Sequence, residues 1–195
     1  MTQEIEIEFK NLLTKEQYEM LLKEFKIDDS KIIRQTNHYF DTPEWHLKTL
    51  HAGLRIRETK STIVCTLKEK TAKNTHLETT DPLTSKEAEM MLRGQHFYAP
   101  SVQRKLLNLN VPVDELKVFG SLTTDRVELS YKGGILVLDH SFYLNCDDYE
   151  VEYEADDENT GAEIFNKFLT DFQIEKRATD KKIARFMKVL NAKKG

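Results

Sequence analysis

The sequence predicts an α+β fold in which about eight antiparallel strands are combined with helices. Stretches in which apolar and charged residues alternate recur along the chain, and this period of two is typical of strands with one buried face. Short polar or glycine-containing turns such as Lys132-Gly133-Gly134 join neighbouring stretches, which favours hairpins and antiparallel pairing. Segments with apolar residues at helical spacing lie between these hairpins, so helices and strands are expected to mix along the chain.

The N-terminal half is predicted to hold five strands and one helix. Residues 3–10 place charged side chains on one face and Ile5, Ile7 and Phe9 on the other, which predicts the first strand. Thr14 is a suitable N-cap for a helix over 15–25. The further strands are expected over 31–40, 54–57, 63–70 and 77–83, the last cut short by Pro82.

The C-terminal half is predicted to begin with helices and to return to strands. The expected elements are helices over 86–93 and 102–109, strands over 118–131 and 135–144, a turn over 145–148, an acidic strand over 149–154, and helices over 161–172 and 180–192. No linker, low-complexity tract or fixed-period repeat divides the chain. Its 195 residues suit one domain of ordinary size, so we predict a single domain over residues 1–195.

Composition excludes several classes of protein. The formal net charge is only −4, so no basic excess supports nucleic-acid binding. The acidic N-terminus, MTQEIEIEFK, does not resemble a signal peptide, and no run approaches the roughly 18 apolar residues of a membrane span. The cysteines, Cys65 and Cys146, lie far apart and are expected to be reduced thiols. We therefore expect a cytoplasmic protein without a nucleic-acid or membrane partner.

The charged residues, 32% of the chain, gather on particular strand faces. A sheet with one solvated face would explain the alternation by itself. Two features favour a binding site instead. Acidic strands lie near both ends of the chain and basic strands in the middle, and the bases include Arg55, Arg57 and Arg126, which suit bidentate phosphate contacts. Strands closed into a barrel with these faces inward would offer carboxylates to divalent cations and cationic groups to phosphate oxygens.

The order of these segments resembles that of the CYTH superfamily, the triphosphate tunnel metalloenzymes. Glu6-Ile7-Glu8-Phe9-Lys10 matches the ExExK signature of that family. The other similar segments are, in order, Tyr39-Phe40-Asp41-Thr42-Pro43, Leu54-Arg55-Ile56-Arg57, Thr66-Leu67-Lys68, Arg126, Val137-Leu138-Asp139, Glu150-Val151-Glu152-Tyr153-Glu154 and Lys182-Ile183-Ala184-Arg185-Phe186. The likeness spans nearly the whole chain. Lys181 stands where the family has a small Ser, which leaves Lys181 as an alternative to Lys182.

The resemblance implies an eight-stranded antiparallel β-barrel, or tunnel, with helices packed outside it. It implies that this single CYTH-like domain binds a triphosphate together with Mg²⁺ or Mn²⁺. The implied metal ligands are Glu6, Glu8, Asp139, Glu150 and Glu152, with Glu154 nearer the tunnel mouth. The implied phosphate-binding residues are Lys10, Arg55, Arg57, Lys68, Arg126 and Lys182. The implied catalytic residues are Glu6, Glu8, Lys10 and Lys68.

The activity expected from this resemblance is metal-dependent hydrolysis of inorganic triphosphate or a similar short polyphosphate. The protein would act on this small molecule as a monomer or homodimer. One alternative is a class IV-type adenylyl cyclase that makes cyclic AMP from ATP. The other is a non-catalytic module that binds polyphosphate or nucleotide. The glutamates argue against that module, because anion binding alone requires only the cations.

Overall fold

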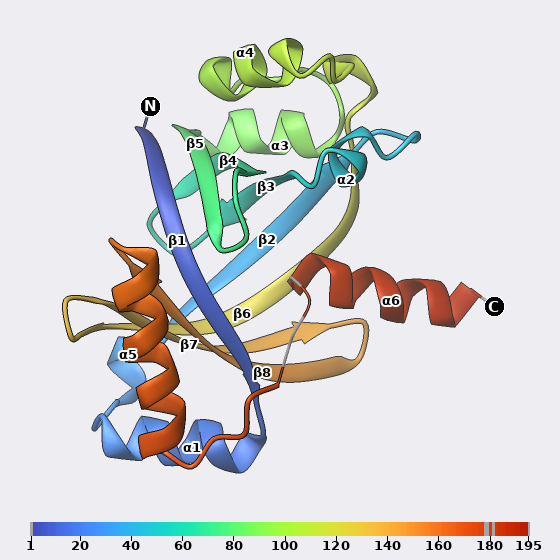
Figure 1. The fold of residues 1–195 in the computed structure, drawn as a ribbon. Helices are drawn as coiled ribbons and strands as arrows, with labels where there is room; N and C mark the ends of the chain where they lie inside the picture. Colours follow the sequence, from blue (N-terminus) through green and yellow to red (C-terminus); the bar gives the residue numbers. More distant parts are fainter. Residues whose placement is uncertain (1, 178–179, 181, 195) are drawn as a thin grey trace. The chain divides into compact units, whose positions relative to one another are not determined.

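The computed structural model describes residues 2–177, 180 and 182–194. In this part of the chain the strands are β1 (Thr2–Leu13), β2 (Ile33–Asp41), β3 (Gly53–Glu58), β4 (Ile63–Lys70), β5 (Thr75–Pro82), β6 (Lys117–Tyr131), β7 (Gly134–Tyr143) and β8 (Cys146–Ala155). They form a closed antiparallel barrel in the order β1-β5-β4-β3-β2-β6-β7-β8 (Figure 1). The predicted eight-stranded barrel is therefore confirmed.

The α-helices of the described residues are α1 (Lys15–Glu24), α2 (His46–Thr49), α3 (Ser85–Leu92), α4 (Pro100–Asn108), α5 (Glu158–Asp171) and α6 (Lys182–Lys194). Two single-turn 3-10 helices are η1 (Asp29–Lys31) and η2 (Val113–Glu115). Thr14 caps α1 as expected, since its side chain accepts the amide of Gln17 and the Gln17 side chain accepts the amide of Thr14. Across these described segments, no helix combines the length and the apolar character that a membrane crossing requires.

The predicted elements are present, with ends that differ by one to three residues in most cases. The expected turn over 145–148 is wrong, because β8 begins at Cys146 and pairs there with Tyr143. Leu144 and Asn145, both with positive φ, make a tighter turn than the polar sequence indicated. Helix α2 and the two 3-10 helices were not expected.

The chain forms two compact units, each with its own core. Unit 1 comprises residues 1–5 and 35–121, and unit 2 comprises residues 6–34 and 122–195. In unit 1, helix α4 packs on β4 and β5. Apolar side chains from α4 and β4 and from β2, β3, α2 and α3 form the core of this unit, including Phe40, Leu54, Leu67, Met91 and Leu106. Burial of these side chains holds the helices against one face of the strands.

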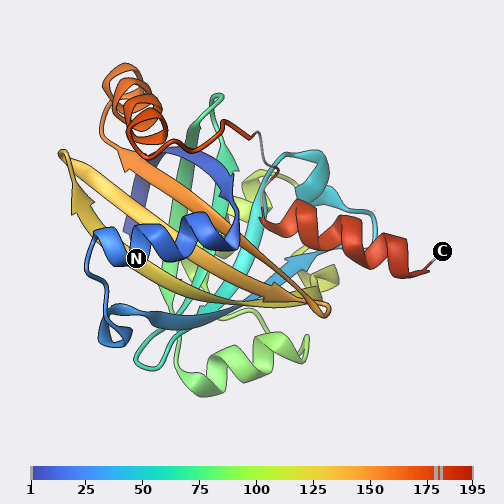
Figure 2. The same ribbon diagram turned by 90° about the horizontal axis from the view of Figure 1, so that it is seen from below.

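Unit 2 has the same arrangement with different elements. Helices α1 and α5 pack on β8, and α1 crosses β7 and β8 (Figure 2). The core between these helices and strands includes Leu21, Val127, Leu138, Val151 and Phe168. The alternation seen in the sequence follows from this packing, because apolar residues face the helices and charged residues lie on the opposite face of the strands. The charged face of unit 2 holds the site described below.

The β6–β7 hairpin depends on a glycine at the start of β7. A Cβ atom added at Gly134 would lie 2.3 Å from the carbonyl oxygen of Glu154 and 2.7 Å from the Tyr153 ring. Because the nearest atom belongs to the backbone, we expect Gly134→Ala to destabilise the protein by about 1–3 kcal/mol. Gly53→Ala is the control, since nothing lies within 4 Å of the position that its methyl group would take. Chemical denaturation measures both, and equal stability of the two variants would contradict the prediction.

Candidate active site

Strand register brings the predicted acidic and basic residues of unit 2 together. Arg126 of β6 is opposite Asp139 of β7, and Asp139 is opposite Glu150 of β8, so these three form a row across the sheet. On the other side of β8, Lys10 of β1 is opposite Glu152. Directly opposite residues on one face have Cβ atoms about 5 Å apart. The register alone therefore places carboxylates and cations within contact distance.

Arg126 makes the closest contacts of the row. Its Nε and Nη2 atoms donate to both oxygens of Asp139 at 2.8 and 2.6 Å, a bidentate pair. Its Nη2 also donates to Glu152 Oε2 at 3.1 Å. Asp139 is fully buried and Arg126 nearly so. Arg126 and Asp139 therefore contact each other, and the phosphate role of Arg126 and the metal role of Asp139 stay predictions.

Lys182, the first residue of α6, lies among the carboxylates of β7 and β8. Its Nζ atom is 2.8 Å from Asp139 Oδ2, 2.5 Å from Glu150 Oε1 and 2.9 Å from Glu152 Oε1. The sequence predicted that Lys182 binds phosphate oxygens, whereas the structure pairs it with three acidic side chains. The alternative residue, Lys181, lies outside the described residues.

A second cation of α6, Arg185, was not predicted as a site residue. Its Nη1 atom is 2.6 Å from Glu150 Oε2, and it donates from Nε and Nη2 to both oxygens of Asp148 at 2.9 and 3.0 Å. The hydroxyl of Tyr143 donates to Asp148 as well. Arg185 is thus anchored to the end of the β7–β8 hairpin and supports Glu150 from the side opposite to Lys182.

The ExExK residues of β1 extend this network. Lys10 Nζ lies 3.2 Å from Glu8 Oε1 and 3.4 Å from Glu152 Oε1, which joins Glu8 to the acidic group. Glu6 is hydrogen-bonded to Glu154 instead. The structure therefore brings Glu8, Lys10, Asp139, Glu150 and Glu152 together with Arg126 and Lys182 and links Glu6 to Glu154.

Burial and charge act in opposite directions on these carboxylates. Burial raises the pKa of Glu150 to about 7, and the neighbouring charge of Glu152 adds to this, although Lys182 opposes it. Burial also favours the neutral form of Glu152, but Lys182 and Lys10 outweigh it and hold the pKa of Glu152 well below its ordinary value. Burial beside Glu6 raises the pKa of Glu154 to about 7. Burial therefore favours the neutral forms of Glu150 and Glu154, while the neighbouring cations keep Glu152 ionised.

The donor set suits a divalent cation. Asp139, Glu150 and Glu152 each offer a carboxylate oxygen, and these oxygens lie within 4.8 Å of one another. All three side chains are buried, so the cluster is not a solvated acidic patch. Carboxylate oxygens are the ligands that Mg²⁺ and Mn²⁺ prefer. The residues present therefore fit the metal that the resemblance implies, with Glu8 next to the group through Lys10.

Unit 1 holds the predicted cations of β3 and β4. Arg55 Nη2 and Lys68 Nζ lie 3.7 and 3.3 Å from the same oxygen of Glu78 on β5. Arg57 donates from Nε to the side-chain oxygen of Asn37 at 3.0 Å. Burial raises the pKa of Glu78, but Arg55 and Lys68 outweigh it and lower that pKa to about 2. Glu78 and Asn37, which were not predicted from the sequence, therefore orient the three predicted phosphate ligands of this unit.

Removing the charge of Glu78 is expected to destabilise unit 1. In Glu78→Gln the neighbouring cations Arg55 and Lys68 lose the carboxylate between them, which costs about 1–3 kcal/mol. An added polyvalent anion supplies the missing charge, so inorganic triphosphate should raise the melting temperature of the variant more than that of the wild type. Thermal denaturation with and without triphosphate checks this. An unchanged melting temperature in Glu78→Gln would contradict the orienting role.

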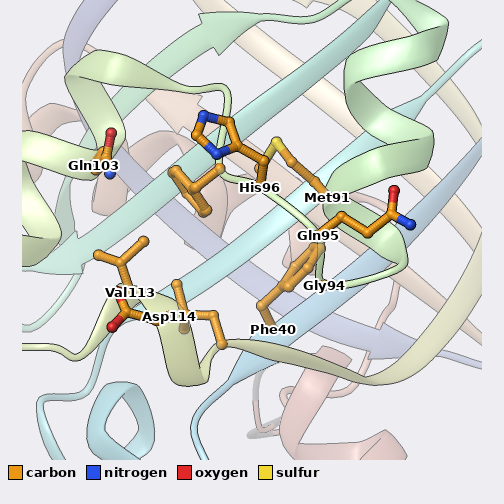
Figure 3. A pocket seen from close by; sticks show the side chains of 10 residues that line it. Phe40, Met91, Gly94, Gln95, His96, Gln103, Val113 and Asp114 are labelled. Atoms are coloured by element: carbon orange, nitrogen blue, oxygen red, sulfur yellow. The ribbon is translucent and has the colours of Figure 1, made fainter.

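Unit 1 also contains a pocket of about 270 Å³ between the α3–α4 connection and η2 (Figure 3). Its lining includes the buried apolar side chains of Phe40, Met91 and Val113 and the polar side chains of His96 and Gln103. None of the predicted site residues lines it. The charged groups described above, and not this pocket, carry the chemistry that the sequence predicted.

Comparison with known proteins agrees with this geometry. The CYTH domain family matches residues 4–187. The chain belongs to this family. The match includes the ExExK strand, all the acidic and basic residues of the two units described above, and the first turns of α6. The resemblance inferred from the sequence is therefore confirmed.

Among the similar proteins are two that are at least 40% identical to this CYTH chain. A Bacillus subtilis (strain 168) protein named "Putative triphosphatase YjbK" is 42% identical over 186 residues, which cover 95% of this chain and 96% of that protein. A Bacillus halodurans structure described as a "putative adenylate cyclase" has a TM-score of 0.91 at 40% identity, covering 95% of this chain and 99% of that one.

A more distant structure shows the same fold. HpAC1 from Hippeastrum has a TM-score of 0.79 at 22% identity and covers 94% of this chain and 95% of its own. That protein is described as a "putative adenylyl cyclase" with a dominant triphosphatase activity. At this identity the likeness supports the barrel, while its activity remains a property of that protein.

Proposed function

We propose that this CYTH protein is a divalent-metal-dependent triphosphatase that hydrolyses inorganic triphosphate or a similar short polyphosphate. The observation that carries the proposal is the buried group of Asp139, Glu150 and Glu152 surrounded by Lys10, Arg126 and Lys182. Burying several carboxylates is costly unless cations compensate them, so such a group is suited to bind a metal ion. The relative named as a triphosphatase supports the same activity.

The proposed division of roles follows the chemistry of the side chains. Glu6, Glu8, Asp139, Glu150 and Glu152 are proposed to hold Mg²⁺ or Mn²⁺. The bound ion would neutralise charge on the phosphate oxygens and lower the pKa of a water molecule. Lys10, Arg55, Arg57, Lys68, Arg126 and Lys182 are proposed to bind phosphate oxygens. Phosphoryl transfer to water depends mainly on positioning and charge stabilisation, which these cations provide, with Lys10 or Lys68 assisting the leaving group.

Phosphate release from a panel of substrates tests the proposal. The panel is inorganic triphosphate, ATP and thiamine triphosphate, each with Mg²⁺, with Mn²⁺ and with a chelator. We expect turnover of inorganic triphosphate that requires the metal and is lost in a Glu6→Gln, Glu8→Gln double variant. If no substrate is hydrolysed while triphosphate still binds, the protein is a binding module and the proposal is wrong.

A class IV-type adenylyl cyclase is the second candidate. It is favoured by the Bacillus halodurans structure described as a "putative adenylate cyclase". Cyclisation would use the same metal and phosphate ligands but would direct the ribose hydroxyl of ATP to the α-phosphate and release pyrophosphate. Chromatography of the ATP reaction separates the two activities. Cyclic AMP and pyrophosphate indicate the cyclase, and orthophosphate indicates the hydrolase.

The remaining expectations from the sequence belong to this proposal. We propose that residues 1–195 act as a single CYTH-like domain, as a monomer or homodimer, in the cytoplasm. Both cysteines are free, with Cys65 buried and Cys146 exposed, which agrees with a reducing compartment. The proposed partner is the triphosphate substrate, without nucleic acid or membrane.

A further inference from the structure

The ammonium group of Lys182 occupies the position between the three carboxylates that suit a metal ion. Its Nζ atom lies 2.5–2.9 Å from one oxygen each of Asp139, Glu150 and Glu152. The neighbouring cations contact the same carboxylates: Lys10 contacts Glu152, and Arg126 contacts Asp139 and Glu152. Lys182 therefore makes with its nitrogen the contacts that a small cation would make with the same oxygens.

A divalent ion and this ammonium group cannot occupy that position together. Mg²⁺ binds oxygen at about 2.0–2.1 Å, so it would need the oxygens that now accept hydrogen bonds from Lys182. Cations brought this close in a buried site also repel each other strongly. The metal must therefore displace Lys182 from the carboxylates.

The side chain of Lys182 can move away from the carboxylates while helix α6 stays in place. Lys182 and Arg185 lie three residues apart on α6, and Arg185 holds both oxygens of Asp148. Phe186, on the next position, is buried against Tyr143. The lysine side chain is a flexible four-carbon stem, whereas Arg185 is fixed by its bidentate pair. The ammonium can swing away while α6 stays attached through Arg185.

We propose that Lys182 is an exchangeable counter-ion of the metal site. It neutralises Asp139, Glu150 and Glu152 when no divalent cation is bound, and it leaves when the metal enters. The released ammonium then binds phosphate oxygens of the substrate. This inference rests on the proposed metal-dependent function, and it joins the phosphate role predicted from the sequence with the carboxylate contacts seen in the structure.

The exchange couples metal binding to substrate binding. When no triphosphate is present, a metal ion that binds must break three ammonium–carboxylate contacts, and this cost lowers the affinity of the protein for the metal. A triphosphate offers the released ammonium a new anionic partner, so metal and triphosphate each strengthen the binding of the other. Removing the ammonium should therefore raise the affinity for metal alone and weaken this coupling.

Calorimetric titration of Mn²⁺ into the substrate-free protein tests the exchange. We expect Lys182→Met to bind Mn²⁺ about tenfold or more tightly than the wild type, because the competing charge is gone. Lys188→Met is the matched control, since Lys188 is an exposed lysine on the same helix that pairs with Asp180. It should bind Mn²⁺ as the wild type does. Equal or weaker binding by Lys182→Met would overturn the proposal.

Labelling of lysines in the wild type gives a second test that needs no folded variant. An amine-reactive acetylating reagent followed by mass spectrometry measures the accessibility of each lysine. Mn²⁺ should increase labelling of Lys182 and leave labelling of Lys188 unchanged. Labelling of Lys182 that does not respond to Mn²⁺ would overturn the exchange.

The outcomes separate this inference from the proposed function. If the wild type binds Mn²⁺ and hydrolyses triphosphate but Lys182→Met binds Mn²⁺ no more tightly, the exchange is wrong and the triphosphatase remains. If neither protein binds Mn²⁺ and hydrolysis does not respond to chelator, the metal-dependent function and the exchange both fail. Tighter binding in Lys182→Met together with metal-dependent hydrolysis supports both.

Discussion

Glu152→Gln is expected to reduce metal-dependent triphosphate hydrolysis about 100-fold or more. Glu152 contacts Lys10, Arg126 and Lys182 and is one of the three carboxylates of the proposed metal site. Glutamine has nearly the same shape but carries no charge. The variant therefore keeps the packing of β8 while it loses an anionic oxygen for the metal and the common partner of three cations.

Steady-state assays with inorganic triphosphate over a range of Mn²⁺ concentrations measure this effect. Higher Mn²⁺ should recover part of the activity, because a weakened metal site is refilled by mass action. The matched control is Glu19→Gln on α1, an exposed glutamate whose partner is Lys15, and it should leave activity unchanged. A Glu152→Gln enzyme that is folded and as active as the wild type would exclude Glu152 from the site.

The sequence predicted the strands well because each has one face against helices. In β1 and β8 the apolar residues Phe9, Val151 and Tyr153 pack toward α5 while the charged residues alternate with them. This alternation of apolar and charged residues follows from the fold, and it can be recognised in the sequence before the structure is known. The start of β8 was mistaken for a turn because Cys146, Asp147 and Asp148 are polar, yet their backbones pair with β7.

The partners of the site residues were harder to predict than the residues themselves. Lys182 lies about 30 positions beyond Glu150 and Glu152, so its contact with them depends on where α6 begins and not on any local pattern. Glu78 was missed because an acidic residue on a strand next to a basic strand is also typical of a solvated face. Arg185 was missed as a site residue because its contacts with Asp148 and Glu150 of β8 depend on where α6 begins, which no local pattern shows.

Arg126→Met is expected to destabilise unit 2 strongly. The substitution removes both hydrogen bonds to the fully buried Asp139 and one to Glu152. Breaking a buried ion pair by removing one partner costs about 3–5 kcal/mol, and Lys182, which still contacts Asp139, replaces the lost charge only in part. For a chain of this size that loss lowers Tm by roughly 10 °C.

The stability lost in Arg126→Met should become smaller as the pH falls. Burial raises the pKa of Asp139, but Arg126 and Lys182 outweigh it and hold that pKa below the ordinary value of 3.8. The ionised pair therefore stabilises the folded wild type above pH 3.8, and this contribution is lost as the pH falls through the lower folded-state pKa. Without Arg126, Lys182 alone opposes the effect of burial, so the pKa of Asp139 is higher than in the wild type and the carboxyl group takes up a proton more readily.

Denaturant unfolding of wild type and Arg126→Met at neutral and at mildly acidic pH measures this difference. The stability gap should be largest at neutral pH and should narrow as the pH falls, because Asp139 becomes neutral first in the variant. Arg93→Met is the control, since Arg93 forms an exposed pair with Glu89 on α3, and such pairs contribute about 0–1 kcal/mol. A gap that stays constant with pH would mean that Arg126 stabilises the barrel through packing of its side chain and not through the charge of Asp139.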